Sequence, residues 1–503
     1  MQNAAIVLKI NRNMKRTIDN QQRERILSKI INEMSYSEYA RAVGLDRVKN
    51  FADFQRYIPL VTYEDLKPYV ERVLRGQSGT LTRSPVVVWA STSGPDNEPK
   101  LVPYTEPFIR FYRKANFRLF RQIFHRHPQV FLGKILVLAG RGEVGKTPTG
   151  LTIGSASGLM LRRLNVPARI ILACRGEQVD EVCDENRFAH IAGLCCTQDV
   201  RCVLATSPTF IFGLLEELTK TLNASNEELG KTAQEVWPNL RLICCPTGGY
   251  AGWHVRQLVS ILPNTEIWDT GLGATEGHFT STMCLPEPVG LPNSDIYIIE
   301  LVETSSYYEG AVKRIWSVEE AETGRVYELV ISAINGFLRY RIGDLVIPED
   351  YGNHRCLRFH SRVTPELSKF GERITDNQLR TAIERAEVKT DIYLRHLLVL
   401  EPRPEQRKSH FTIIATPSYP IQVPLQKSQI FGKVVDETLQ EININYFNMR
   451  NIFSRLNEFS VKIISLDSYQ AIRKSSRVTP LYKGQGKEYY ISSGKGLEAE
   501  NQL

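Results

Sequence analysis

The chain has 503 residues, of which 42% are hydrophobic and 23% are charged. This composition excludes disordered and fibrous classes, and the length exceeds one ordinary hydrophobic core, so we expect two domains. The net charge of +8 comes from 63 basic and 55 acidic residues spread along the chain, which favours small anionic ligands and argues against nucleic acid as a partner.

The nine cysteines are an odd number, and two pairs are adjacent, Cys195-Cys196 and Cys244-Cys245. Most of them lie in apolar runs, which predicts reduced, buried thiols in a cytoplasmic protein. There is no Cys-x-x-Cys pair and no HExxH spacing, so we expect no zinc site. The N-terminal apolar stretch 4–8 is too short for a signal sequence, and no run approaches the ~18 residues of a membrane span, so we expect no membrane partner.

The first third of the chain is predicted to be mainly helical. Charged residues with apolar positions at helical spacing predict helices over 17–43. Thr62 is an N-cap candidate with Asp65 three residues later, a capping-box variant that begins the next helix. An amphipathic helix is predicted over 107–125, and we expect its aromatic stripe to face the core rather than a ligand. The stripe consists of Phe108, Phe111, Phe117 and Phe120.

The middle of the chain alternates strand-like and helical runs, which is typical of a layered α/β body. We expect strands at 134–139, 168–173, 240–245 and 266–270, with helices at 209–222 and 252–262. From residue 295 the strands come close together, at 295–302, 326–334 and 345–348, and predict a mixed or antiparallel sheet.

Beyond residue 362 the pattern changes to that of a compact α+β unit. We expect helices at 376–387 and 425–447, and strands at 393–400, 410–415 and 460–466. The fold class is therefore α/β, with a large N-terminal layered domain containing mixed sheets over 1–365 and a smaller, mobile α+β domain over 366–503. No Gly/Ser-rich or Pro-rich linker joins them, so we expect a short hinge near 362–371.

Residues 89–105 have the outline of a phosphate-binding loop that follows a strand. Its hydroxyl residues and its lysine are Ser91, Thr92, Ser93 and Lys100. The centre is unusual, because Pro95 lacks an N–H donor and the carboxylates of Asp96 and Glu98 would repel a phosphate. The loop is either altered or serves another purpose.

A second stretch, Gly-Arg-Gly-Glu-Val-Gly-Lys-Thr at 140–147, fits the P-loop pattern GxxxxGK[ST]. A P-loop requires the lysine and threonine to begin a helix whose N-terminus faces the phosphates. Residues 148–158 are poor helix formers because they contain a proline, three glycines and several hydroxyl residues. We therefore expect a surface loop here.

Four later motifs are each ambiguous alone. The glycine-rich turn at 269–278 presents Thr275 and Glu276, which suit a magnesium ion and a phosphate oxygen, although a plain turn is the alternative. Segment 337–344 places Asp344 where it can accept two hydrogen bonds from a ribose, or form a salt bridge. Residues 359–362 and 367–375 form a basic stretch that is either a hinge or a solvated loop. Finally, Lys487 ends the glycine-containing stretch 482–487, and we expect its side chain either to swing into a site or to be merely solvated.

These motifs, in this order, resemble the adenylate-forming (acyl-CoA synthetase/luciferase-like) superfamily, and within it the auxin-responsive promoter (Gretchen Hagen type) family of acyl acid-amido synthetases. The resemblance covers most of the chain. It is carried by Ile58-Pro-Leu-Val-Thr-Tyr-Glu-Asp65, Thr92-Ser-Gly94, Pro99-Lys-Leu-Val-Pro103, Val236-Trp-Pro-Asn-Leu240, Thr247-Gly-Gly249, Ala274-Thr-Glu-Gly277, Tyr340-Arg-Ile-Gly-Asp344 and Leu367-Ser-Lys-Phe-Gly-Glu-Arg373.

The resemblance implies an N-terminal domain that binds ATP and an acyl acid, and a C-terminal domain that acts as a lid. It implies two half-reactions: a carboxylic acid and Mg-ATP give an acyl adenylate and pyrophosphate, and an amine or amino acid then takes the acyl group, releasing an amide and AMP. ATP and Mg2+ are the implied cofactors.

The resemblance also implies roles for residues. The catalytic residues would be Glu276, which also holds the magnesium, Arg373 at the hinge, and Lys487, which stabilises charge at the α-phosphate. The nucleotide-binding residues would be Ser91, Thr92, Ser93 and Lys100 at the phosphates, Thr247 and Gly248 beside the adenine and acyl group, Ala274 and Thr275 beside Glu276, Asp344 at the ribose, and Tyr340 and Arg362 in the neighbouring motifs.

The chain departs from the family in the phosphate loop. After Gly94 the family has two hydroxyl residues and a glycine, where this chain has Pro95, Asp96 and Asn97. Each lost hydrogen bond to a charged phosphate costs on the order of 1 kcal/mol or more, which would slow adenylation. The Pro-Arg that follows the lid lysine in the family is replaced by Glu488-Tyr489.

Three readings remain open from the sequence. The first is an ATP-dependent acyl acid-amido synthetase. The second is an acyltransferase that uses a pre-activated donor such as a thioester, without adenylation. The third is a non-catalytic protein that binds AMP or an acyl ligand.

Overall fold

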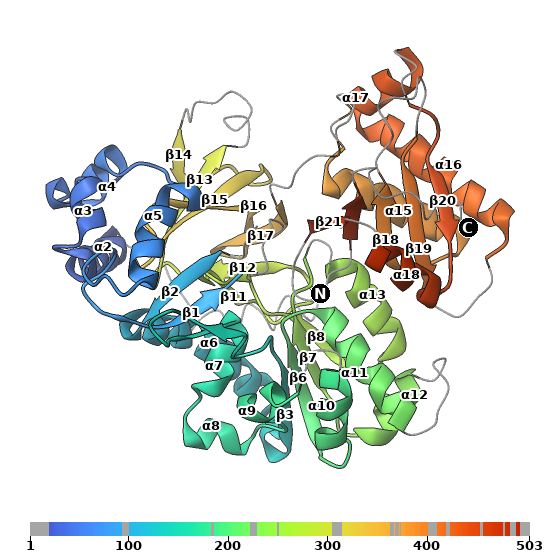
Figure 1. Cartoon of the computed structure of the whole chain (residues 1–503), viewed down its shortest axis with the longest axis horizontal. Helices are drawn as coiled ribbons and strands as arrows, with labels where there is room; N and C mark the ends of the chain where they lie inside the picture. Colours follow the sequence, from blue (N-terminus) through green and yellow to red (C-terminus); the bar gives the residue numbers. More distant parts are fainter. Residues whose placement is uncertain are drawn as a thin grey trace. The chain divides into compact units, whose positions relative to one another are not determined.

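The computed structural model describes residues 20–492, except 93–99, 183–185, 222–228, 249–250, 304–313, 363–366, 368–371, 373, 401–409, 419–422, 453–455, 476–477 and 483–488. The described chain divides into two compact units, and the larger one ends at Arg362. Figure 1 shows their helices and strands.

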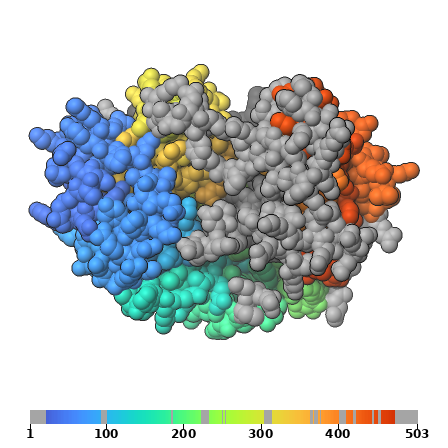
Figure 2. Space-filling model, turned by 45° about the horizontal axis from the view of Figure 1, so that its top comes forward, coloured from blue at the N-terminus to red at the C-terminus, as the bar shows by residue number. Residues whose placement is uncertain are grey.

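The larger unit begins with a group of short helices. They are α2 (Asn20–Met34), α3 (Glu38–Ala42), α4 (Phe51–Tyr57) and α5 (Tyr63–Leu74). The expected cap of α5 is confirmed, because a carboxylate oxygen of Asp65 accepts hydrogen bonds of 2.8 Å from both the N–H and the hydroxyl of Thr62. Figure 2 shows the atoms of this N-terminal part of the chain in blue, beside yellow atoms from the part of the chain near residue 300.

That antiparallel sheet has seven strands in the order β11-β12-β17-β16-β15-β13-β14. The strands are β11 (Thr280–Thr282), β12 (Val289–Pro292), β13 (Ile298–Glu303), β14 (Ile315–Ser317), β15 (Tyr327–Ser332), β16 (Tyr340–Tyr351) and β17 (His354–Arg362). Every pairing is antiparallel. Of the two arrangements expected from the sequence, the antiparallel one is therefore correct.

The N-terminal helices are fastened to this sheet by a buried ion pair. Arg339 Nε lies 3.0 Å from a carboxylate oxygen of Glu300, and both side chains are almost fully buried. Arg339 also donates to the carbonyl oxygens of Gln55 and Ile58, at 2.9 and 2.7 Å. Removing one partner would leave a buried charge unpaired, so this pair fixes the segment after α4 against the start of β16.

A four-stranded parallel sheet forms the other layer, in the order β3-β6-β7-β8. The strands are β3 (Lys134–Leu138), β6 (Val200–Ala205), β7 (Leu242–Cys245) and β8 (Glu266–Asp269). Alternate side chains along each strand enter different cores. One core packs against helices α10 (Arg187–Cys195), α11 (Pro208–Thr221) and α13 (Ala251–Ile261), and the other packs against α6 (Glu106–Arg126).

Helix α6 packs against both sheets. Its first half belongs to the hydrophobic core of the antiparallel sheet, and its second half belongs to a core of the parallel sheet. The expected aromatic stripe is wrong in one position. Phe108 is buried, but Phe117 is 67% exposed. Nine residues separate them, and at about 100° per residue this places Phe117 on the opposite face. The buried face instead carries Tyr112, Ala115 and Leu119.

The expected strand at 168–173 is also wrong. Residues Val166–Ile170 form a short helix, α8. Asn165 caps it by accepting a hydrogen bond from the N–H of Ala168, and a proline follows in the first turn, where its missing N–H costs nothing. Only Leu172 pairs with the parallel sheet, through an isolated bridge to Ile135.

Smaller elements complete the larger unit. A four-stranded sheet has the order β2-β1-β5-β4, built from β1 (Val86–Ser91), β2 (Leu101–Thr105), β4 (Gly145–Lys146) and β5 (Thr152–Gly154). Two-residue strands β9 (Gly273–Ala274) and β10 (Gly277–His278) form a hairpin. The remaining helices are α7 (Ala156–Arg162), α9 (Gly176–Asp180) and α12 (Leu229–Val236), with 3₁₀ turns at Leu45–Arg47 and Pro128–Leu132.

The smaller unit is an α+β fold around a five-stranded sheet of order β20-β19-β18-β22-β21. Its strands are β18 (Leu394–Leu400), β19 (Thr412–Pro417), β20 (Ser460–Ile463), β21 (Val478–Tyr482) and β22 (Tyr489–Ser492). Its helices are α15 (Asp376–Thr390), α16 (Leu425–Ile442), α17 (Ile444–Phe447) and α18 (Leu466–Ser475), with one π-helical turn at Asn448–Ile452. The single helix expected over 425–447 is interrupted at Asn443, which is extended and whose side-chain oxygen accepts from the N–H of Tyr446.

The eight cysteines among the described residues are all free, and all but Cys196 are buried. The same residues contain no cluster of three or more histidine, cysteine, aspartate or glutamate side chains suited to a metal ion. None of the helices described here is both long and apolar enough to cross a membrane.

Candidate active site

The candidate site is centred on Glu276, at the tip of the β9-β10 hairpin. Thr275 and Glu276 form the two-residue turn. The turn is held from two sides, because Tyr104 OH donates to the Thr275 carbonyl at 2.6 Å and Tyr340 OH donates to a carboxylate oxygen of Glu276 at 3.2 Å. Gly277 admits no side chain, since a Cβ would lie 2.8–2.9 Å from the rings of Phe279 and Tyr297.

Glu276 is a carboxylate removed from water and surrounded by charges. It is only 5% exposed, and this burial raises the pKa of its carboxyl. Arg362 opposes the rise in pKa, Asp344 adds to it, and Lys100 opposes it more weakly. These residues come from distant parts of the sequence, so the fold brings four of the predicted site residues to one place.

Asp344 and Arg362 are direct partners on the antiparallel strands β16 and β17. Arg362 Nε lies 2.8 Å from Oδ1 of Asp344, and the Asp344 side chain is only 6% exposed. The preceding Gly343 has φ of 80°, a left-handed conformation that glycine adopts without strain. The salt-bridge alternative for Asp344 is therefore what the structure shows.

Tyr340 is positioned by the segment between α4 and α5. Val61 pairs with Tyr340 in a parallel bridge, through hydrogen bonds from Val61 N to the Arg339 carbonyl and from Arg341 N to the Val61 carbonyl. The sequence interpretation counted the stretch 58–65 among the family motifs, but the only structural role that it gave the stretch was a helix cap. Its second purpose is visible only in the fold, because it requires backbone pairing between distant residues.

The phosphate-loop candidates lie at the end of the β1-β2 pair where the chain passes from one strand to the other. Ser91 ends β1 opposite Leu101, and Thr92 and Lys100 close the pair. Thr92 N donates to the Lys100 carbonyl at 2.9 Å, and Lys100 N donates to Thr92 Oγ1 at 3.2 Å. The Lys100 ammonium lies 5.5 Å from the ring centroid of Tyr63. Ser93 and the unusual residues 95–98 lie outside the described residues, as do Arg373 and Lys487.

Thr247 lies at the carboxyl end of the parallel sheet, the edge where ligands bind in open α/β sheets. Its N–H and its hydroxyl both donate to Oδ2 of Asp269, each at 2.8 Å. The neighbouring Gly248 has no room for a side chain, since a Cβ would lie 2.6 Å from Pro288. Ala274, the last residue of β9, belongs to the hairpin that carries Glu276.

Asp269 is a residue that the sequence interpretation missed, although it begins the glycine-rich turn. It accepts a third hydrogen bond, 2.7 Å, from the N–H of Gly271. Burial raises the pKa of its carboxyl to about 6, despite these hydrogen bonds. Asp269 thereby joins the loop after β7 to the loop that leads to Glu276.

The P-loop-like stretch at 140–147 is not a P-loop. Gly145 and Lys146 form strand β4, antiparallel to β5, and the next helix, α7, begins only at Ala156. The lysine therefore does not begin a helix, which agrees with the sequence argument. The stretch is less open than the surface loop we expected, since Gly142 is buried and its N–H donates to both carboxylate oxygens of Asp180.

Comparisons with known proteins give the class of the fold. A solved acyl acid amido synthetase, AtGH3.15 in complex with 2,4-DB, superposes with a TM-score of 0.79 at 16% identity, covering 100% of this chain and 96% of that one. Among sequence relatives, an indole-3-acetic acid-amido synthetase, GH3.8 of Oryza sativa subsp. indica, is 25% identical over 72% of this chain and 69% of its own length. A jasmonoyl-L-amino acid synthetase, JAR4 of Nicotiana attenuata, is 24% identical over 72% of both chains.

The fold is thus that of the acyl acid amido synthetases. Residues 8–224 match the GH3 family N-terminal domain, and residues 291–362 match the GH3 family central domain. The chain belongs to the GH3 family.

Proposed function

We propose that the chain is an ATP-dependent acyl acid-amido synthetase, which activates a carboxylic acid as its acyl adenylate and transfers the acyl group to an amino acid or another amine. The observation that carries the proposal is the buried Glu276 carboxylate, which Lys100, Asp344 and Arg362 surround and to which Tyr340 donates a hydrogen bond, in a chain of the GH3 family. A fixed set of charges in a site shielded from water is suited to stabilising the charge that develops at a phosphate.

In the first half-reaction, an oxygen of the acid attacks the α-phosphorus of ATP, a new P–O bond forms, and pyrophosphate leaves. In the second, the amine nitrogen attacks the acyl carbon, the C–O bond to AMP breaks, and the amine loses a proton. The residues assigned to the nucleotide and acyl groups are Ser91, Thr92, Ser93, Lys100, Thr247, Gly248, Ala274, Thr275, Tyr340, Asp344 and Arg362. We assign Asp344 to the ribose because its carboxylate, which Arg362 holds on a neighbouring strand, is a group that can accept hydrogen bonds from a diol.

Glu276 is the residue we assign to magnesium. Mg2+ is commonly held by only one or two carboxylates together with the phosphates of its substrate, so a single buried carboxylate with one tyrosine donor fits this ion. When bound, the ion would neutralise phosphate charge. The chain's own contribution is to hold the carboxylate at the tip of a hairpin that Tyr104 and Tyr340 fix.

The remaining assignments rest on the family resemblance. Residues 1–365 form the nucleotide and acyl-acid domain, and residues 366–503 form the lid domain, with Arg373 at the hinge and Lys487 directed at the α-phosphate. We place the protein in the cytoplasm, because its described cysteines are free.

The test is release of pyrophosphate by the purified chain with ATP, Mg2+ and a broad panel of carboxylic acids. We expect release that depends on the acid, and amide formation when amino acids are added. Absence of both with every acid would refute the proposal.

The residues at 95–98 favour one second candidate, transfer from a pre-activated donor such as a thioester, because they remove phosphate donors from the loop. Amide formation from an acyl thioester without ATP supports that candidate, and strict dependence on ATP removes it. AMP binding with no turnover of any acyl donor would instead support the hypothesis of a non-catalytic binding protein.

A further inference from the structure

Tyr63, the first residue of α5, lies against the start of β2 in the larger unit. Its hydroxyl accepts a hydrogen bond of 2.8 Å from the N–H of Leu101 and donates one of 3.2 Å to the carbonyl oxygen of the same residue. A hydroxyl can make both bonds because it has one donor and two acceptor sites. Burial raises the pKa of the Tyr63 hydroxyl, so this group keeps the proton that it donates.

These two bonds satisfy main-chain groups that the sheet leaves unpaired. Strand β2 lies at the edge of its sheet, whose order is β2-β1-β5-β4. The main-chain groups of Lys100 bond with Thr92, whereas those of the next residue, Leu101, bond with Tyr63. Two residues further along the same edge, Pro103 has no N–H to pair. Because unpaired groups on an edge strand are open to water, the tyrosine hydroxyl fixes the place where β2 begins.

The ring of Tyr63 contacts the residue that precedes this point. The ammonium of Lys100 lies 5.5 Å from the ring centroid, within the range of a cation–π attraction. One tyrosine therefore holds the main chain at Leu101 and the charged end of the side chain before it. A lysine has a flexible four-carbon stem, and a contact that orders the stem beforehand reduces the entropy lost when a ligand binds.

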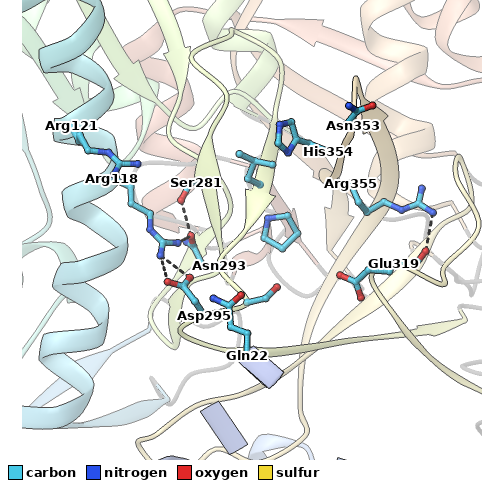
Figure 3. A pocket seen from close by; sticks show the side chains of 13 residues that line it. Gln22, Arg118, Arg121, Ser281, Asn293, Asp295, Glu319, Asn353, His354 and Arg355 are labelled. Carbon is cyan, nitrogen blue, oxygen red and sulfur yellow. Dashed lines mark hydrogen bonds and ion pairs between the residues drawn. The ribbon is translucent and has the colours of Figure 1, made fainter. Parts of the chain in front are cut away.

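An aromatic ring holds a cation differently from a carboxylate. In the cavity of about 170 Å³ that Figure 3 shows, Arg118 donates to both carboxylate oxygens of Asp295, at 2.6 and 2.5 Å. Such a pair neutralises the arginine and leaves it little attraction for an anionic ligand. The Tyr63 ring is uncharged, so its contact positions the Lys100 ammonium and leaves the positive charge available to a phosphate.

The segment that carries Tyr63 is itself fixed beside the candidate site. Val61 pairs with Tyr340, whose hydroxyl donates to Glu276. Two residues after Val61, Tyr63 begins α5, and the capping box at Thr62 fixes this first turn. The same short segment therefore contacts the tyrosine that supports the magnesium carboxylate and the lysine assigned to the phosphates.

We infer that Tyr63 is a positioning residue for Lys100, and that it holds the lysine ready for the β- and γ-phosphates of ATP. The inference rests on the proposed function, in which Lys100 binds the phosphates, and it adds a residue that acts through the lysine. The hydroxyl fixes the main chain and the ring fixes the ammonium. Loss of Tyr63 therefore weakens ATP, which carries these two phosphates, and spares AMP, which lacks them.

The first test is calorimetric titration of the full chain with ATP and with AMP, each with Mg2+ and without a carboxylic acid, so that the result does not depend on turnover. Tyr63→Leu should weaken ATP by about fivefold or more and AMP by less than about twofold. In a Lys100→Met background, Tyr63→Leu should not weaken ATP further, because the two residues act as one unit. Tyr69→Leu is the matched control and should bind both nucleotides normally, since this ring lies on the same helix and also contacts a cation, Arg72 at 5.1 Å.

The second test uses the chain without nucleotide. Tyr63→Phe keeps the ring and removes only the hydroxyl, so hydrogen exchange at the Leu101 amide should become about tenfold faster or more. Tyr69→Phe should leave the exchange of Leu101 unchanged. Mass spectrometry of a peptide that contains Leu101 measures both rates.

Three results would overturn the inference: unchanged Leu101 exchange in Tyr63→Phe, equal losses of ATP and AMP affinity in Tyr63→Leu, or a further loss of ATP affinity when Tyr63→Leu is added to Lys100→Met. If the expected ATP binding is found but no acid gives pyrophosphate release, the proposed function fails and the inference about Tyr63 stands. If the wild type binds no ATP, both fail.

Discussion

Replacing Tyr340 with phenylalanine removes the hydrogen bond that the tyrosine hydroxyl donates to the Glu276 carboxylate. Hydrogen bonds to charged groups contribute about 1.5–3 kcal/mol. At 3.2 Å this one is longer than the usual O–H···O distance, so we take the lower end, about 1.5 kcal/mol, which corresponds to a pKa shift of about one unit.

The direction of the pKa shift follows from the negative charge of the ionised Glu276 carboxylate. Burial already raises the pKa of Glu276, and the tyrosine hydroxyl favours the ionised form, so its loss raises this pKa further. Because magnesium requires the ionised carboxylate, the acidic limb of the pH profile for pyrophosphate release should move about one unit to higher pH in Tyr340→Phe.

Tyr39→Phe is the matched control. It removes a hydroxyl that is buried in the N-terminal helices, without a hydrogen-bond partner. Its acidic limb should coincide with that of the wild type. An unshifted limb in Tyr340→Phe, or an equal shift in both variants, would refute the role of Tyr340 at Glu276.

Three more predictions concern the same site. Asp344→Asn should raise the KM for ATP about tenfold, the effect of about 1.4 kcal/mol, while transfer from a supplied acyl adenylate keeps its kcat; an unchanged KM would contradict the ribose assignment. Asp269 has a folded pKa of about 6, above its value in the unfolded chain, so its contribution to stability is present below about pH 4 and is lost as the pH rises through 6. The Tm advantage of the wild type over Asp269→Asn should therefore shrink between pH 4 and pH 7 in thermal unfolding, and a growing advantage would contradict the burial argument. Replacing Pro95, Asp96 and Asn97 by Thr, Thr and Gly should raise pyrophosphate release at least tenfold, since it restores two hydroxyl donors and an N–H donor; an unchanged rate would show that the loop does not limit adenylation.

The sequence predicted the layers of the fold well where periodicity was long and uninterrupted. Helix 107–125 and the strands at 134–139 and 240–245 correspond closely to α6, β3 and β7. The prediction failed at 168–173, a short run that is apolar except for Arg169 and that suits either a short helix or a strand. The cap at Asn165 decides for a helix.

For the candidate site, motif order predicted which residues the fold assembles around Glu276. It did not predict the contacts that hold those residues in place. Asp269 looked like part of a plain turn, because its three donors come from two loops that are separate in sequence. The backbone pairing of Val61 with Tyr340 has no side-chain pattern, so no reading of residue types reveals it.

The central claim is that this chain makes acyl adenylates, and isotope exchange between pyrophosphate and ATP tests it most directly. We expect exchange that requires both Mg2+ and a carboxylic acid, and that Glu276→Gln reduces by at least a hundredfold. Exchange that is absent with every acid, or amide formation from an acyl thioester without ATP, would contradict the claim.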